Sequence, residues 1–235
     1  MSVIYFGCGS GISGDMVVGS LLDLGVEIEY LARELSRMDL SGYSVSARKV
    51  DKRGVEATKF NVAVEGIHPR RNLPGINSLI EKSGLGRRVK DLSQGIFTDL
   101  ARSEALAHST SIENVHFHEV GAVDSIIDIV SAAILLDMLE VSEVHCGTVS
   151  LGRGRIRTEH GMMDIPAPAV RDLLKDAPTA QTDIPAELTT PTGAAILKSC
   201  VKKYKNKPPE TGRIGYGAGT SDLPIPNVLR AWINP

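Results

Sequence analysis

Residues 2–25 read SVIYFGCGSGISGDMVVGSLLDLG, and this stretch decides the fold class. Its first five residues are mostly apolar and predict a strand, after which glycines at positions 7, 9, 11 and 14 predict a tight loop. The apolar residues Val17, Leu21 and Leu24 then recur at helical spacing before Gly25, a common C-cap. A strand, a glycine loop and a helix in this order indicate a fold that mixes strands and helices.

The rest of the chain continues with helical and strand patterns and has no internal repeat. We expect helices over residues 28–38, 87–108, 123–139, 169–175 and 190–204. We expect a hairpin of strands 43–50 and 55–64, further strands over 115–120, 144–151, 155–158 and 228–233, and a glycine cluster at 212–219 before the last strand. Together these patterns predict an α/β or α+β fold with a mixed β-sheet, packed helices and at least one β-hairpin.

Residues 66–75 contain two prolines and are the best candidate for a linker. A linker there could divide the 235 residues into subdomains 1–66 and 76–235. Between Arg48 and Lys90 there are eleven Lys or Arg and four Asp or Glu, although the whole chain has a net charge of −2. This local basic excess could attract an acidic partner, or it could be a solvated surface.

Composition excludes several classes of protein. The net charge of −2 and an aromatic content of 4% argue against a nucleic-acid-binding protein. No apolar run reaches the roughly 20 residues of a membrane-spanning helix, and no basic segment precedes the first apolar run. We therefore expect a cytoplasmic protein without a membrane partner. The three cysteines are odd in number and lack a C-x-x-C spacing, which excludes a disulfide framework and a thiolate zinc site.

The glycine loop invites three interpretations. Gly9-x-Gly11-x-x-Gly14 matches the dinucleotide-binding fingerprint, but residues 26–38 have helical periodicity where a second parallel strand should follow. A nicotinamide-dependent oxidoreductase is therefore disfavoured. The N–H groups of residues 11–14, with the hydroxyls of Ser10 and Ser13, could instead bind a phosphate, provided that Asp15 caps the helix or holds a cation. The third interpretation is a plain strand-to-helix turn.

Two further groups of residues could carry chemistry. Thr190 and Thr192 stand at the start of an expected helix, where they could form a second anion site or a simple N-cap. Glu104 and His108 share a helix face, and His116 and His118 share a strand face, with Glu119 next. Imidazole and carboxylate ligands together suit nickel, zinc, iron or copper, so these five residues are candidates for metal binding or acid–base chemistry.

Several long strings together resemble the LarC family of nickel-pincer cofactor biosynthesis proteins. They are SGISGDM (10–16), EALAH (104–108), VHFHEVGAVDSIIDI (115–129), PAPA (166–169), ELTTPTGAAI (187–196), GYGAGT (215–220) and PNVLR (226–230). The resemblance implies a nickel insertase of the chelatase-type lyase class, which is a CTP-dependent cyclometallase acting on pyridinium-3,5-bisthiocarboxylic acid mononucleotide. It also implies nickel, and CTP with a divalent cation, as the groups that are bound.

Within the reaction that the resemblance implies, we assign roles to individual residues from their spacing, as hypotheses. Formation of a nickel–carbon bond on the pyridinium ring releases a ring proton, for which Glu119 or His118 is the expected base. The expected nickel ligands are Glu104, His108, His116, His118 and Glu119, and the expected substrate-binding residues are Ser10, Gly11, Ser13, Gly14, Asp15, Thr190 and Thr192.

Full-length members of the family continue into a C-terminal domain that supplies much of the nickel and CTP binding. We therefore expect this chain to be an N-terminal part that works with a C-terminal domain or subunit. The alternative is a non-catalytic module that binds a mononucleotide or a metal for a separate partner. The sequence leaves the oligomeric state open, including a homo-oligomer.

Overall fold

The computed structural model describes residues 2–66, 68, 71–112, 115, 117, 122–158 and 161–234. Within these residues there are seven helices: α1 (Gly14–Asp23), α2 (Ile28–Leu35), α3 (Leu73–Lys82), α4 (Arg87–Ala107), α5 (Val123–Met138), α6 (Pro168–Leu173) and α7 (Pro191–Cys200). The same residues form eleven strands: β1 (Ser2–Gly7), β2 (Tyr43–Asp51), β3 (Glu56–Val64), β4 (Val141–Cys146), β5 (Val149–Leu151), β6 (Gly154–Thr158), β7 (Gly161–Ile165), β8 (Thr179–Gln181), β9 (Val201–Tyr204), β10 (Arg213–Ala218) and β11 (Val228–Asn234).

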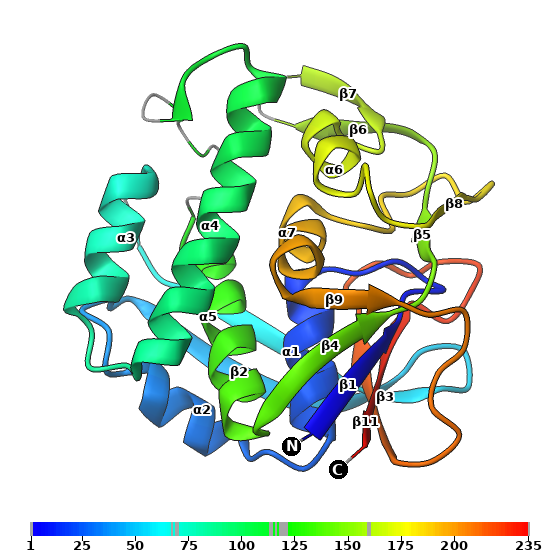
Figure 1. Cartoon of the computed structure of the whole chain (residues 1–235), viewed down its shortest axis with the longest axis horizontal. Helices are drawn as coiled ribbons and strands as arrows, with labels where there is room; N and C mark the ends of the chain where they lie inside the picture. The colour runs from blue at the N-terminus through cyan, green and yellow to red at the C-terminus, as the bar shows by residue number, and fades with distance from the viewer. Residues whose placement is uncertain are drawn as a thin grey trace.

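Seven strands form one mixed sheet in the order β2-β3-β10-β11-β1-β4-β9 (Figure 1). Strand β1 pairs with β4 in parallel and with β11 in antiparallel orientation, so the two ends of the chain lie side by side. Two small sheets, β5-β8 and β6-β7, lie outside this sheet. The structure confirms an α/β fold with a mixed sheet, and the expected hairpin is β2-β3.

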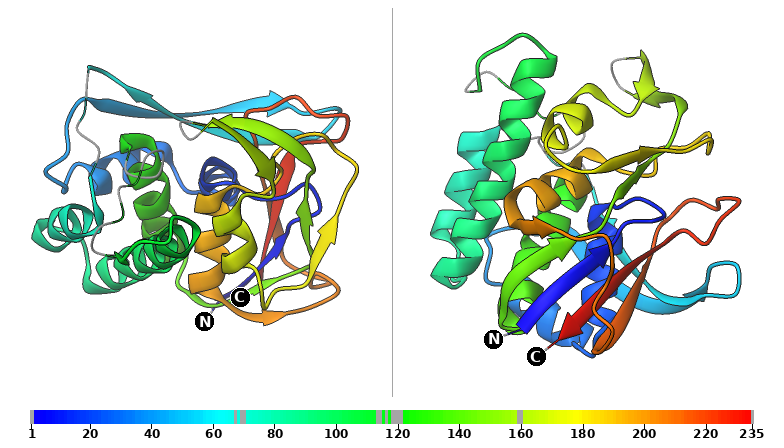
Figure 2. Two further views of the ribbon diagram at one scale, coloured as in Figure 1. Left: turned by 90° about the horizontal axis from the view of Figure 1, so that it is seen from above. Right: turned by 45° about the vertical axis from the view of Figure 1, so that its right-hand side comes forward.

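Helix α1 lies at the centre of the molecule, between the strands on one side and α5 and α7 on the other (Figure 2). It contacts β10, β3 and β11, and its approach to β10 is close because β10 presents glycines to it. A Cβ atom on Gly215 or Gly217 would overlap the backbone oxygen of Ser20 or Met16, respectively. The glycines of β10 therefore fix how near α1 approaches the sheet, and with it the position of the first turn of α1.

The hydrophobic core fills the space between the sheet and the helices and includes the fully buried Phe6, Phe60 and Phe97. Residues from both expected subdomains belong to this core, although β3 joins the rest of the sheet through only one residue pair, Thr58 with Gly217. The division into subdomains 1–66 and 76–235 stays a prediction. In the described part of the chain, no helix combines the length and the apolar character needed to cross a membrane.

Several expected elements differ in the structure. The helix expected over 190–204 ends at Cys200, because residues 201–204 extend to pair with β4 as strand β9. The glycine cluster at 212–219 is largely strand β10, and the expected linker already contains the start of α3, where the Asn72 side chain accepts a hydrogen bond from the Gly75 N–H. The strand expected over 115–120 lies outside the described residues, apart from the buried Val115 and Phe117.

Candidate functional site

A cleft opens where three helices begin. Its first lobe, of about 460 Å³, is lined by the starts of α1, α5 and α7, by Lys59 of β3 and by Thr220 from the loop between β10 and β11. A second lobe, of about 370 Å³, has Arg155, Ile156, Ile165 and Asn227 in its walls. The two lobes adjoin along a shared wall of five residues, and we treat them as one cleft: Ser13, Asp15, Glu187, Thr190 and Thr220.

The two anion sites that the sequence suggests separately belong to this one cleft. Ser13, Gly14 and Asp15 at the start of α1 line the first lobe together with Thr190 and Thr192 at the start of α7. Backbone hydrogen bonds hold the two segments together, since the Ile12 N–H donates to the Leu188 carbonyl and the Thr190 N–H donates to the Ile12 carbonyl. The glycine loop and the start of α7 are therefore parts of the same wall.

Other groups of the predicted phosphate-binding loop form hydrogen bonds within the protein instead. The Gly11 N–H donates to the Cys8 carbonyl, and the Ile12 N–H is used as described above. The Ser10 hydroxyl donates to the Pro226 carbonyl at 2.7 Å. The prediction that an anion lies against all the N–H groups from residue 11 to residue 14 is therefore wrong for Gly11 and Ile12, whose donors already have protein acceptors.

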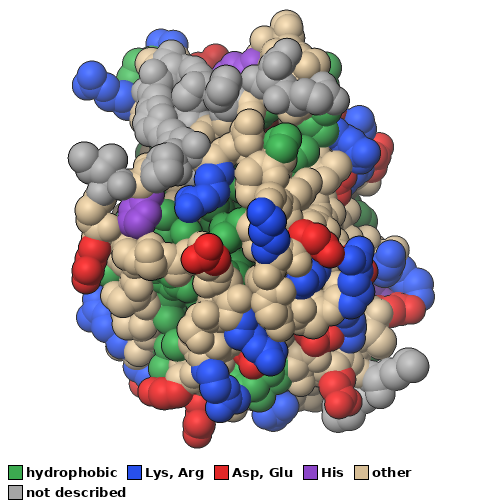
Figure 3. Space-filling model, turned by 90° about the vertical axis from the view of Figure 1, so that its left-hand side faces the viewer, with side chains coloured by type: hydrophobic (Ala, Val, Ile, Leu, Met, Phe, Trp, Pro, Cys, Tyr) green, Lys and Arg blue, Asp and Glu red, His purple; other side chains and the backbone are tan. Residues whose placement is uncertain are grey.

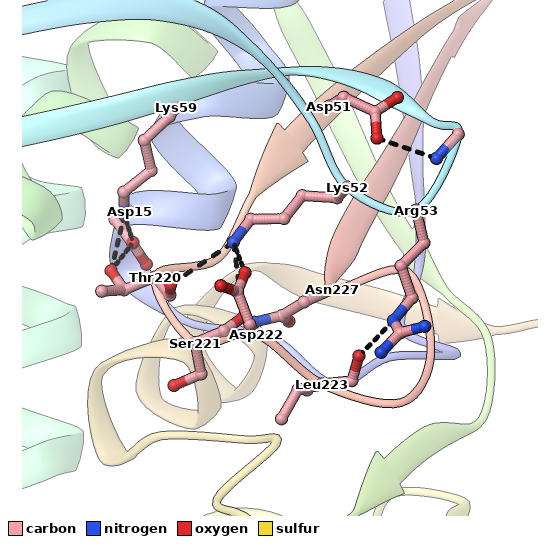
Figure 4. Close-up of polar contacts among 11 residues, drawn as sticks. Asp15, Asp51, Lys52, Arg53, Lys59, Thr220, Ser221, Asp222, Leu223 and Asn227 are labelled. Atoms are coloured by element: carbon pink, nitrogen blue, oxygen red, sulfur yellow. Dashed lines mark hydrogen bonds and ion pairs between the residues drawn. The ribbon is translucent and has the colours of Figure 1, made fainter.

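Asp15 is the centre of a polar network in the cleft (Figure 4). Its carboxylate forms an ion pair with Lys59. It also accepts a hydrogen bond from the Ser13 hydroxyl and one from the Met16 N–H at 2.9 Å. The Lys59 Nζ also donates to Thr220 Oγ1 at 2.7 Å, which lies 3.2 Å from the second oxygen of Asp15. Because the Lys59 side chain is only 14% exposed, this network holds one ammonium group firmly at the rim of the cleft.

Asp128, on the second turn of α5, faces the first turn of α1. A Cβ on Gly14 would lie 2.5 Å from its Oδ2, so the absence of a side chain at Gly14 makes room for this carboxyl. Burial raises the pKa of Asp128 well above its usual range, and the nearby carboxylates of Asp15 and Asp124 raise it further. Lys59 and the Asp15 N–H act in the opposite direction. Asp128 therefore keeps its proton to a higher pH than an ordinary carboxyl group.

The charge of the first lobe favours cations. Among its described lining residues, four carry carboxyl groups (Asp15, Asp124, Asp128 and Glu187), and one, Lys59, is a lysine or arginine. The N-terminus of a helix usually attracts anions. In this lobe, however, side chains at the helix starts already accept hydrogen bonds from N–H groups of the first turn. The Ser125 N–H donates to Asp124 at 2.9 Å, and the Gly193 N–H donates to Thr190 at 3.2 Å. The lobe thus suits a ligand that carries positive charge as well as an anionic group for Lys59.

The structure describes only part of the predicted metal set. Glu104 and His108 lie at the end of α4 with 3.5 Å between His108 Nε2 and Glu104 Oε2, so they share a face as expected. His116, His118 and Glu119 lie outside the described residues. Among the residues that are described, no three His, Cys, Asp or Glu side chains are grouped as a metal site. Convergence of the five residues stays a prediction.

Several basic residues between Arg48 and Lys90 are paired with acids from other elements. Lys49 forms an ion pair with Asp23 of α1, and Lys52 forms one with Asp222. Figure 3 shows the face on the left-hand side of Figure 1, where Lys and Arg side chains alternate with Asp and Glu. On that face the charges form no patch of a single sign.

The sequence patterns did not single out Lys59, Thr220, Asp124 or Asp128 as site residues. The two aspartates have a detectable signal, since they are four residues apart and so share a face at the start of a helix. No pattern in the residues around Lys59 indicates a site, because strand β3 comes to line the cleft only when it pairs with β10 in the sheet.

The fold and the cleft define an α/β protein whose cleft is lined by charged side chains of both signs. A family profile described as nickel insertion protein matches residues 4–235. The chain belongs to the nickel insertion protein family, as the resemblance in its sequence indicated.

Two curated relatives illustrate the similarity. The pyridinium-3,5-bisthiocarboxylic acid mononucleotide nickel insertion protein of Geobacillus kaustophilus is 46% identical over 99% of this chain. The protein of the same description from Desulfitobacterium hafniense (strain DSM 10664 / DCB-2) is 44% identical over 98% of the chain. The chain spans only 60% and 58% of the lengths of these relatives. No solved structure gives a significant match to it.

Proposed function

We propose that this chain takes part in inserting nickel into pyridinium-3,5-bisthiocarboxylic acid mononucleotide, and that the two-lobed cleft holds this substrate. The observation that carries the proposal is the meeting of three helix starts at one cleft, which gathers four carboxyl groups and Lys59. The substrate named for the relatives combines a cationic ring with anionic thiocarboxylate and phosphate groups. A cleft with charges of both signs complements such a ligand.

The side chains of the first lobe bind different parts of the substrate according to their charge. The carboxylates of Asp15 and Asp124 attract the pyridinium ring and the incoming nickel ion, which is also a substrate. Lys59 and the hydroxyl groups of Thr190 and Thr192 bind the anionic groups of the mononucleotide, while the Ser13 hydroxyl holds Asp15 in place. Direct hydrogen bonds of this kind contribute more than the helix dipoles, which are worth about 0.3 to 1 kcal/mol each.

The predicted metal set completes this proposal. Glu104, His108, His116, His118 and Glu119 hold nickel before its transfer, since imidazole and carboxylate ligands suit this ion. When the nickel–carbon bond forms, the ring C–H bond breaks and its electron pair goes to nickel. The proton goes to Glu119 or His118.

The remaining parts of the reaction are assigned to a partner. CTP, with a divalent cation, binds to a C-terminal domain or subunit that acts with this chain in the cytoplasm, either as one pair or as a homo-oligomer of pairs. The length of the relatives supports this assignment, since the chain matches only about three fifths of each. The second candidate function is a binding module that holds the mononucleotide or nickel without catalysing insertion.

A nickel-insertion assay tests the proposal. The purified chain is incubated with nickel, the mononucleotide and CTP, with and without a separately produced C-terminal domain from a relative. We expect turnover only in the mixture and its loss with Lys59→Ala, whereas Arg48→Ala, an exposed basic residue on the same hairpin, should have no effect. Equal turnover by the chain alone would refute the need for a partner. Tight mononucleotide binding without turnover in the mixture would favour the binding module.

A further inference from the structure

The tip of the β2-β3 hairpin has an unusual residue in its turn. Lys52 and Val55 close a two-residue turn, with the Lys52 N–H 2.9 Å from the Val55 carbonyl oxygen. Arg53 and Gly54 fill the turn with φ angles of 57° and 83°, which define a type I′ turn. Glycine or asparagine is usual at the first of these positions, because a left-handed backbone is unfavourable for a long side chain. Arginine at position 53 therefore makes the turn less stable than asparagine or glycine would.

Both basic side chains at this tip bind one loop, residues 219–227 between β10 and β11 (Figure 4). The Lys52 Nζ lies 2.8 Å from Asp222 Oδ1 and 3.4 Å from each of the Thr220 and Ser221 carbonyl oxygens. The Arg53 Nε donates to the Leu223 carbonyl oxygen. The Lys52 side chain is only 14% exposed, although that of its partner Asp222 is 93% exposed.

The loop held in this way is a wall of the cleft. Thr220 lines both lobes, and Gly219, Ser221 and Asn227 line the second lobe. Lys52 and Arg53 line neither lobe. Their contacts with the loop reach the cleft only through the backbone of residues 220–223.

We propose that Lys52 and Arg53 are positioning residues, which clamp the 219–227 loop in the place that the substrate requires. This inference rests on the proposed function of the cleft. It explains why arginine occupies a turn position that favours asparagine, since only a long donor can reach the Leu223 carbonyl. The hairpin tip thereby sets the affinity of a site that it does not touch.

The test uses Arg53→Asn, which suits the turn better but removes the clamp. We expect an equal or higher Tm, about tenfold faster amide hydrogen exchange in residues 219–227, and at least fivefold weaker binding of pyridinium-3,5-bisthiocarboxylic acid mononucleotide in calorimetry. Arg53→Lys keeps a donor and should bind the mononucleotide within about twofold of the original chain. Arg48→Asn removes an exposed charge from the same hairpin and serves as the matched control.

Each outcome decides one question. Unchanged exchange or unchanged affinity in Arg53→Asn would overturn the clamp, as would equal weakening of binding by Arg48→Asn. Absence of mononucleotide binding by the unaltered chain would instead overturn the proposed function of the cleft. The exchange measurement needs no ligand, so the two failures are distinguishable.

Discussion

Replacing Gly217 with alanine tests whether α1 can lie on the sheet only because β10 carries glycine there. The added Cβ would stand 1.9 Å from the Met16 carbonyl oxygen and 2.5 Å from the Ser20 nitrogen, where ordinary contacts begin at 3.4 Å. Both neighbours are backbone atoms of α1, which cannot turn aside as a side chain would. The helix and the strand must therefore separate locally by about 1.5 Å.

That separation disturbs the packing of α1 on the core. Overpacking by one methyl group usually costs about 1–3 kcal/mol, and the contact with rigid backbone places this case at about 3 kcal/mol or above. For a chain of 150–250 residues each kcal/mol lowers Tm by about 2–4 °C, so we expect a loss of about 6–12 °C. Because α1 also carries Asp15, its ion pair with Lys59 should weaken as well.

Urea unfolding followed by circular dichroism measures this loss, with Gly9→Ala as the control. Gly9 has a permitted backbone conformation and no atom within 4 Å of the added Cβ, so this variant should be within about 0.5 kcal/mol of the original chain. A Gly217→Ala variant that lost less than about 1 kcal/mol, or no more than Gly9→Ala, would refute the packing argument.

Three further outcomes are expected. Asp128→Asn should have a higher Tm than the original chain above neutral pH but not at pH 4. Thermal unfolding measured across that pH range tests this. A carboxyl whose folded-state pKa is raised loses stability as pH rises from its unfolded pKa through the folded one, by about 1.4 kcal/mol per pKa unit. Thr190→Ala should lose about 0.5–2 kcal/mol in urea unfolding by removing the α7 N-cap, whereas Thr190→Ser should keep most of it. Replacing His116 and His118 together with alanine should lower nickel affinity at least tenfold in calorimetry, and an unchanged affinity would make these histidines structural.

Local patterns predicted the elements that depend on nearby residues. The apolar spacing placed the helix over 87–108, and the structure has α4 at Arg87–Ala107. Residues 201–204 continue a helical pattern, yet they become β9 because β4 offers them a parallel partner from more than fifty residues away. In the same way, Gly215 and Gly217 suggest a loop in the sequence, whereas in the structure they belong to strand β10 and leave room for the backbone of α1. Distant partners override local preference in both cases.

The candidate site shows the same division. Each helix start could be recognised from its own residues, such as Ser13 with Asp15 and Thr190 with Thr192. Their meeting could not, because it depends on the hydrogen bond from the Thr190 N–H to the Ile12 carbonyl, across 178 positions of sequence. Lys59 enters the cleft through strand pairing alone, so its place follows only from the assembled sheet.

The position of β11 between β1 and β10 affects how the protein is made. On the ribosome, residues 228–234 emerge soon after β10 but long after β1, so β1 waits with one edge unpaired during most of synthesis. Unpaired edges readily join strands of other chains. A chain that lacks the seven residues of β11 would leave one edge of β1 and one edge of β10 unpaired, and the 219–227 loop would lose its anchor at one end. We therefore expect this truncation to cause aggregation rather than a milder defect of the cleft.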